Sequence, residues 1–171
     1  MGQRVGLVTN GRDAADRIRE EGWNTEFRTR AVARANIGMR EQSDRLRPII
    51  IETRRTSDQL TRILETLARL ELTDGLEFHE LAVEAASRLP RNATVVAVLT
   101  AVLPETAVAL VNLRRRGYAV TVVLVVFDEP GTPDWASRPD WAGWLLASGI
   151  DLRRVESEAA LSALCAERLV R

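Results

Sequence analysis

A chain of 171 residues, of which 46% are apolar, can bury one hydrophobic core, and it predicts a single domain over 1–171. Its 24 basic residues balance 24 acidic ones, so the charge favours neither nucleic acid nor an anionic membrane as partner. Every basic residue is arginine, which excludes enzymes that need a phosphate-binding or Schiff-base lysine. With one cysteine and one histidine, neither an internal disulfide nor a zinc site is expected.

The longest apolar runs, at 94–100 and 119–127, are much shorter than the roughly 20 residues of a membrane-spanning helix. The N-terminus lacks the apolar segment of a secretion signal. The sequence therefore predicts a cytoplasmic protein without a membrane segment.

The first strand is predicted over 4–9, followed by a helix that Asp13 caps and Gly22 ends. Residues 23–47 mix arginines with small residues and read as an irregular or partly helical excursion. The run Pro48 to Thr53 predicts a strand, and its leading proline places that strand at a sheet edge.

Two helices are predicted next. Thr56 to Gln59 has the spacing of a capping box, and the helix that follows carries one apolar stripe facing away from solvent-facing arginines and glutamate. The stripe consists of Leu60, Ile63, Leu64, Leu67 and Leu70. After a break at 73–75, a second helix runs to Pro90.

The runs at 94–100 and 119–127 are rich in β-branched residues without alternation, as in strands covered on both faces. Pro104 starts a helix between them and Gly117 suits its left-handed end, which predicts a parallel βαβ unit. A proline- and tryptophan-rich loop over 128–140 leads to a short helix near 141–147 and a final strand over 151–155.

Ser157 is predicted to cap a closing helix whose inward residues are Leu161, Leu164, Cys165 and Leu169. The elements together predict an α/β fold of three layers, with a mainly parallel open sheet and helices on both faces.

Thr9, Asn10 and Gly11 follow the first strand, an arrangement that resembles the second motif of haloacid-dehalogenase phosphatases. In those enzymes the hydroxyl holds the transferred phosphate. They also need an upstream strand that ends in Asp-x-Asp, and this sequence has no Asp-x-Asp. A structural turn is therefore the preferred interpretation, with a phosphatase-like enzyme as the alternative.

Trp135, Trp141 and Trp144 lie within ten residues of one another and predict a partner-binding patch or a cover for the end of the sheet. His79 has no nucleophile motif beside it and is interpreted as a surface residue of a helix. The arginines of 28–55 and 114–116 could contact phosphates, but acidic residues such as Glu41, Asp44 and Glu52 accompany them and no aromatic residues interleave. A solvated charged face is therefore preferred over a nucleic-acid site.

The segments "RVGLVTNG", "RRTSDQLTRILETLARL", "LAVEAASRLPRNATVVAVLT" and "LRRRGYAVTVVLVVF" occur in an order that resembles the bacterial family called domain of unknown function fifty-eight. The family is similar to the von Willebrand factor A domain, a Rossmann-like fold. Its members are often encoded beside MoxR-type AAA+ ATPases. The resemblance implies a binding or assembly factor, with such an ATPase as a candidate partner and self-association as a further candidate.

A von Willebrand factor A domain binds Mg²⁺ through an Asp-x-Ser-x-Ser loop, a threonine before a middle helix and an aspartate after the fourth strand. The resemblance places Thr9, Asn10, Thr73, Asp74 and Thr100 at the ligand-binding edge. Asp-x-Ser-x-Ser is absent, and Thr100 is followed by alanine where the family has aspartate. No metal and no other cofactor is therefore expected in this chain.

The sequence and the resemblance together predict a non-catalytic protein-binding or assembly module. The alternatives are the phosphatase-like enzyme and an arginine-mediated nucleic-acid binder. The resemblance also implies a partial domain without the family's first strand. The strands at 4–9 and 94–100 are then expected to pair directly, while residues 31–38 or a second copy are the other candidates to fill the gap.

Overall fold

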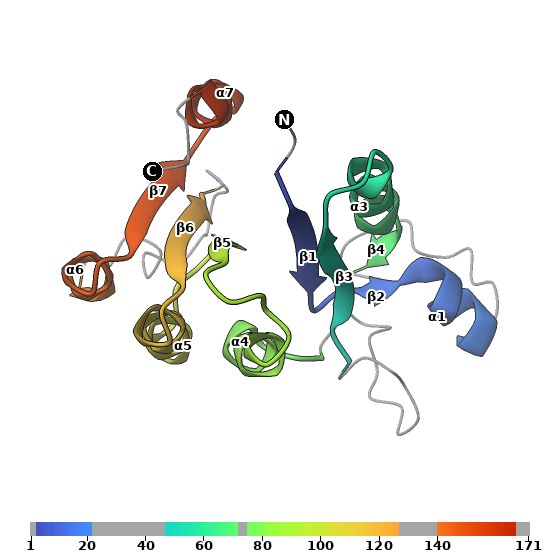
Figure 1. Ribbon diagram of the computed structural model, residues 1–171, viewed down its shortest axis with the longest axis horizontal. Coiled ribbons are helices and arrows are strands. Elements are labelled where there is room, and N and C mark those ends of the chain that lie inside the picture. Colours follow the sequence, from blue (N-terminus) through green and yellow to red (C-terminus); the bar gives the residue numbers. More distant parts are fainter. Residues whose placement is uncertain (1–2, 22–46, 72–74, 127–139, 167–171) are drawn as a thin grey trace. The chain divides into compact units, whose positions relative to one another are not determined.

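The computed structural model describes residues 3–21, 47–71, 75–126 and 140–166 (Figure 1). They form a mixed α/β structure with two compact units, Met1–Leu89 and Pro90–Arg171. The excursion predicted over 23–47 lies outside the described residues, apart from Arg47. None of the helices in the described ranges has both the length and the apolar character that crossing a membrane requires.

The second unit is built on a three-stranded parallel sheet. Its strands are β5 (Thr94–Leu99), β6 (Ala119–Val125) and β7 (Asp151–Val155), in the order β5-β6-β7. Both strand pairs are parallel and in continuous register, from Thr94 opposite Ala119 to Val125 opposite Val155. The predicted βαβ unit and the predicted final strand are both confirmed.

Three helices accompany this sheet. Helix α5 (Pro104–Arg115) connects β5 to β6, α6 (Asp140–Ala147) precedes β7, and α7 (Glu158–Ala166) follows it. Helices α5 and α6 contact each other, while α7 packs against β7 (Figure 1). The core lies between the sheet and the first two helices, and its most buried side chains are Leu110, Val122, Leu145 and Ile150.

Gly117 ends α5 in the left-handed conformation that the sequence predicted, with φ +94°. The N–H of Gly117 donates to the carbonyl oxygen of Arg114 at 3.0 Å, and that of Tyr118 donates to Leu113 at 3.3 Å. Glycine reaches this φ without steric strain. The turn therefore directs the chain into β6.

The first unit contains two antiparallel strand pairs. Strand β1 (Val5–Thr9) pairs with β3 (Ile49–Arg54), and β2 (Arg12–Asp13) pairs with β4 (Leu70–Glu71). The β1–β3 register shifts between Val5 and Leu7. A Cβ on the intervening Gly6 would lie 2.7 Å from the carbonyl oxygen of Ile51, so only glycine fits this irregularity.

The helices of this unit are α1 (Ala14–Glu21), α3 (Gln59–Arg69) and α4 (Phe78–Ala86). Helix α3 contacts β1 and β2, and α4 contacts β1. The buried apolar side chains among the described residues of this unit all come from α4: Leu81, Ala82, Ala85 and Ala86.

The structure does not show the expected direct pairing of the strands at 4–9 and 94–100, which belong to different units. β1 is hydrogen-bonded to β3 and β5 to β6, in two separate sheets. The mainly parallel sheet is likewise found only in part, because β1 and β3 run antiparallel. Strand β3 is nearer to β1 in the sequence than β5 is, so closing the loop between β1 and β3 costs somewhat less entropy.

Three helix starts were predicted from capping residues. Asp13 Oδ1 accepts the N–H of Ala15 at 2.8 Å, and Ser157 Oγ accepts that of Ala160 at 3.2 Å, so both of these caps are confirmed. The capping box from Thr56 to Gln59 is wrong, since the N-cap of α3 is Asp58 and no side chain caps that helix. A capping box is present instead in α4, where Glu80 accepts the N–H of Glu77 at 2.8 Å.

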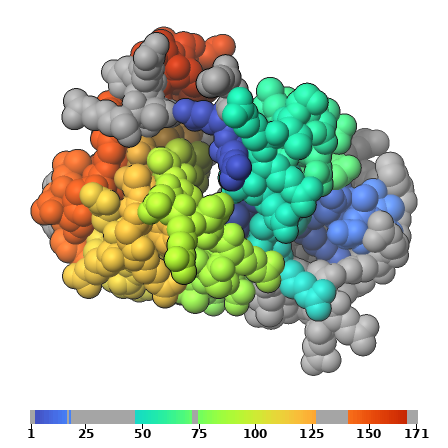
Figure 2. Space-filling view, viewed as in Figure 1, coloured from blue at the N-terminus to red at the C-terminus, as the bar shows by residue number. Residues whose placement is uncertain are grey.

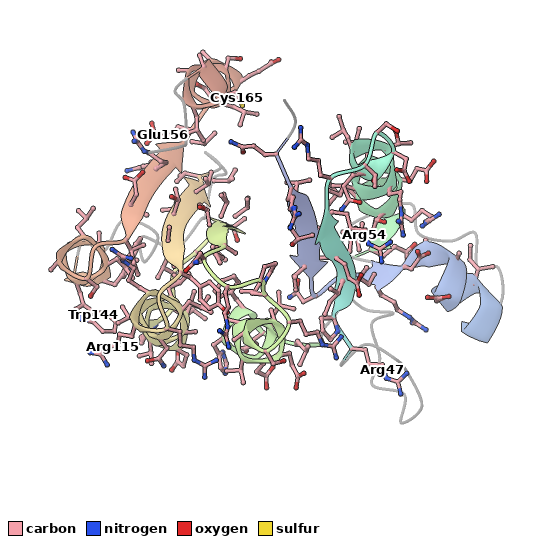
Figure 3. The ribbon with its side chains drawn as sticks, viewed as in Figure 1. Arg47, Arg54, Arg115, Trp144, Glu156 and Cys165 are labelled. Atoms are coloured by element: carbon pink, nitrogen blue, oxygen red, sulfur yellow. The ribbon has the colours of Figure 1, made fainter. Side chains whose placement is uncertain are left out.

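The closing helix is less buried than predicted. Helix α7 has no buried residue; Leu161 and Cys165 are exposed, and Leu164 is half-buried. Leu169 lies outside the described residues. Cys165, labelled in Figure 3, is therefore not the core residue that its apolar neighbours suggested.

The start of α3 leads to a prediction about pH. A hydrogen bond from the Thr56 side chain, with a further one from the backbone N–H of Asp58, holds the pKa of the Asp58 carboxyl below its ordinary 3.8. Because the folded-state pKa is lowered, this interaction is present above pH 3.8 and is lost as the pH falls through the lowered value. We expect Thr56→Val to raise the pKa of Asp58, as followed by NMR titration. Thr61→Val, elsewhere on α3, should leave it unchanged, and a Thr56→Val pKa equal to that of the native chain would contradict the assignment.

Candidate functional site

Thr9 and Asn10 occupy the turn after β1, and their side chains are used within the unit. Thr9 Oγ1 accepts a hydrogen bond from the N–H of Gly11 at 3.2 Å. Asn10 Nδ2 donates to the carbonyl oxygen of Leu76 at 2.7 Å, which ties the end of β1 to the segment before α4. Both residues are half-buried. Their hydrogen bonds stabilise the turn and its connection to α4.

Of the other residues of the predicted ligand-binding edge, Thr100 is in the described part of the chain. Thr73 and Asp74 lie outside the described residues. Thr100 is exposed directly after β5 and belongs to the second unit. Within 3–21, 47–71, 75–126 and 140–166, no three His, Cys, Asp or Glu residues are grouped so that they could hold a metal ion.

Two of the three predicted patch tryptophans are in α6. Trp144 is exposed, as Figure 3 shows, and Trp141 is half-buried three residues earlier. The indole nitrogen of Trp141 is buried without a hydrogen-bond partner among the described residues. Trp135 lies outside the described part of the chain. The structure thus places one indole at the surface of α6.

Several charged side chains are paired with each other. Arg54 Nη2 lies 2.7 Å from Glu52 Oε2, which lowers the pKa of that carboxyl, and Arg69 Nε lies 3.2 Å from Asp13 Oδ2. His79 is half-buried near the start of α4, with Nδ1 3.4 Å from a carboxylate oxygen of Glu77. On β7, Arg153 pairs with Asp151. Isolated ion pairs of this kind, with at least one solvent-exposed partner, contribute little to stability.

The largest departure from the sequence prediction is on α3. Leu60, Leu64 and Leu67 are 64%, 56% and 45% exposed, although they are three of the five residues of the stripe that was expected to be packed. The other two, Ile63 and Leu70, are half-buried. Leu60, Leu64 and Leu67 are spaced i, i+4 and i+7 and so share one side of the helix. We call these three residues the α3 leucine face. In Figure 2 the segment that contains α3, in teal, is seen at the surface.

The side of α3 that packs on the strands is set by Gln59. Its side chain is 3% exposed, and its Nε2 donates to the carbonyl oxygens of Val5 at 2.7 Å and Glu52 at 2.9 Å. Two helical turns later, Thr66 is also buried, and its hydroxyl donates to the carbonyl oxygen of Arg62 at 2.9 Å. The helix therefore packs on the strands through Gln59, Thr66 and the half-buried Ile63, which leaves the leucines outside.

The sequence periodicity correctly predicted that these leucines share one side of α3, but the prediction that this side is buried was wrong for Leu60, Leu64 and Leu67. A 3.6-residue period reports which side chains share a side of a helix, and it carries no information on what that side contacts. The side of α3 that is buried could have been inferred from Gln59 and Thr66, which are seven residues apart and hence also share one side of the helix.

In comparisons with known proteins, the chain matches no family model, no curated protein and no solved structure.

Proposed function

We propose that this chain is a non-catalytic protein-binding module and that the α3 leucine face is its docking surface. The observation that carries the proposal is the exposure of Leu60, Leu64 and Leu67 on one side of a single helix. Scattered exposed apolar residues are ordinary, whereas adjacent large ones on one surface are typical of interaction sites.

The partner that fits this surface is a protein with an apolar helix face or groove. Anchors spaced i, i+4 and i+7 are the pattern by which amphipathic helices are recognised. Within the resemblance to von Willebrand factor A-like proteins, a MoxR-type AAA+ ATPase is the candidate partner. The hydrogen bonds of Thr9 and Asn10 within the turn support a structural role for that turn over a phosphatase site.

A site-specific photo-crosslinking experiment tests the proposal in the native host. A photo-reactive phenylalanine analogue replaces Leu64 in one variant and Val83 in the control; Val83 is an exposed apolar residue of α4 outside the leucine face. We expect a discrete adduct with another protein from position 64 and none from position 83. Mass spectrometry of that adduct then shows whether the partner is a MoxR-type ATPase.

The affinity of this chain for the cross-linked partner gives a quantitative prediction. Truncating or charging an anchor residue of an interface weakens binding by roughly tenfold or more. We therefore expect Leu64→Glu to raise the dissociation constant of the purified pair at least about tenfold, and Val83→Glu to leave it unchanged. An intramolecular adduct from position 64, equal adducts from both positions, or phosphatase turnover that Thr9→Ala abolishes would each contradict the proposed function.

A further inference from the structure

We propose that β5 pairs edge to edge with β5 of a second copy of this chain, in antiparallel orientation. Among the described residues, β5 has a neighbouring strand on one side only, where it pairs with β6. A strand paired on one side presents a row of unpaired backbone N–H and C=O groups at the other. This surface is separate from the α3 leucine face and goes beyond the proposed protein-binding function.

β5 has none of the features by which proteins protect a sheet edge. Residues 94–99 contain no charge, no proline and no glycine, and the register with β6 is unbroken over all six residues. Charged side chains, proline and β-bulges are the usual protections. Two apolar side chains of the strand, Val96 and Val98, are 47% and 65% exposed. Within the described residues of the Pro90–Arg171 unit, this edge is thus open both in its backbone and in its side chains.

The sequence of β5 is complementary to itself in the antiparallel direction. A two-fold axis through Ala97, perpendicular to the sheet, places Val96 opposite Val98 of the second copy and Val95 opposite Leu99. Such an axis keeps the corresponding faces of the two sheets on the same side. The exposed valines of both copies then form one cluster of cross-strand β-branched pairs, which stabilise antiparallel sheets.

The charges that flank β5 also favour this arrangement. Arg91 precedes the strand and Glu105, in the first turn of α5, follows it; both are exposed. In an antiparallel pair the start of one strand lies beside the end of the other, so Arg91 of each copy approaches the end that carries Glu105. A parallel pair would bring like charges together. In the antiparallel arrangement, the two copies of β5 are therefore complementary in charge as well as in their apolar side chains.

Two six-residue strands bury less surface than the roughly 1,600 Å² of a standard stable interface. We therefore expect a dimer that dissociates on dilution. Sedimentation velocity over a concentration series of the full chain should show a concentration-dependent shift from monomer to dimer. Hydrogen exchange should show slower exchange of β5 amides at the higher concentrations.

Two variants test the surface. Lysine on an edge strand opposes edge pairing, so Val98→Lys should weaken self-association by about tenfold or more. Val108→Lys is the matched control, since Val108 is an exposed valine of α5, 49% accessible and away from the edge. It should leave self-association unchanged.

Disulfide trapping tests the register. In a Cys165→Ser background, a Val96→Cys chain is mixed with a Val98→Cys chain under mild oxidation. Directly opposite residues have Cα atoms roughly 4.5–5.5 Å apart and diagonal ones about 7–8 Å, beyond the usual reach of a disulfide. The mixed disulfide should therefore exceed both like disulfides.

Three outcomes would overturn the inference. They are a monomer at every concentration, self-association that Val98→Lys and Val108→Lys affect equally, and like disulfides that match the mixed one. Because Val98→Lys leaves α3 unchanged, cross-linking from position 64 should persist in it. Failure of the β5 pairing is thereby distinguishable from failure of the protein-binding proposal.

Discussion

Replacing Leu110 with alanine should lower the free energy of unfolding of the Pro90–Arg171 unit by about 2–5 kcal/mol. Leu110 lies in α5 and is 0% exposed, in the core that α5 and α6 form with the parallel sheet. Truncation removes apolar contacts and leaves a cavity that a close-packed core fills only in part. Urea unfolding followed by far-ultraviolet circular dichroism measures the loss.

The control for this variant is on the same helix. Val108 is 49% exposed, so Val108→Ala removes little buried surface and should change stability by no more than about 0.5 kcal/mol. Equal losses in the two variants would show that α5 does not pack on the sheet through Leu110.

Replacing Gln59 with leucine should destabilise the first unit by about 1–3 kcal/mol, because it removes the donor of two part-buried hydrogen bonds. Gln59 Nε2 is that donor, at 2.7 Å from the oxygen of Val5 and 2.9 Å from that of Glu52. These bonds join the start of β1, the end of β3 and the first turn of α3. Hydrogen exchange of β1 and β3 amides, which should become faster, measures the effect locally.

The Gln59→Glu variant distinguishes the effect of losing the hydrogen-bond donor from the effect of changing the side-chain volume. An ionised glutamate has nearly the same shape as glutamine but donates no hydrogen bond, so it should destabilise the unit at least as much as leucine. Thr61→Leu introduces the same leucine at an exposed position of α3 and should have little effect. Native exchange rates in Gln59→Glu would contradict the role given to the amide.

Local patterns in the sequence were reliable where short-range physics decides the outcome. The β-branched runs became β5 and β6, Gly117 took the left-handed conformation, and Asp13 and Ser157 capped their helices. Each feature depends on residues within a few positions of one another: steric preference at φ, one side chain reaching a nearby N–H, or a run of branched side chains. The α/β class followed from these elements.

Gln59 shows that local sequence patterns do not predict long-range hydrogen bonds. Its spacing from Thr56 fits a capping box, yet its amide donates to Val5, 54 residues earlier in the chain, and to Glu52. Asn10 behaves similarly, because its partner Leu76 is 66 residues away. Both side chains can make several alternative hydrogen bonds, and the sequence does not state which carbonyl the fold brings near.

The sequence by itself predicted the longer helices and strands, though not the two-residue strands β2 and β4. It also predicted that a helix joins β5 and β6 in a parallel pair, and which leucines of α3 share a side. Only the tertiary structure decided that β1 pairs with β3, that Cys165 is exposed, and that the α3 leucine face points outward. The physical reason is that periodicity and capping act within a few residues. Burial, by contrast, depends on contacts with residues that are distant in the sequence. In α3, the hydrogen bonds from Gln59 to the carbonyl groups of Val5 and Glu52 fix which side of the helix is buried.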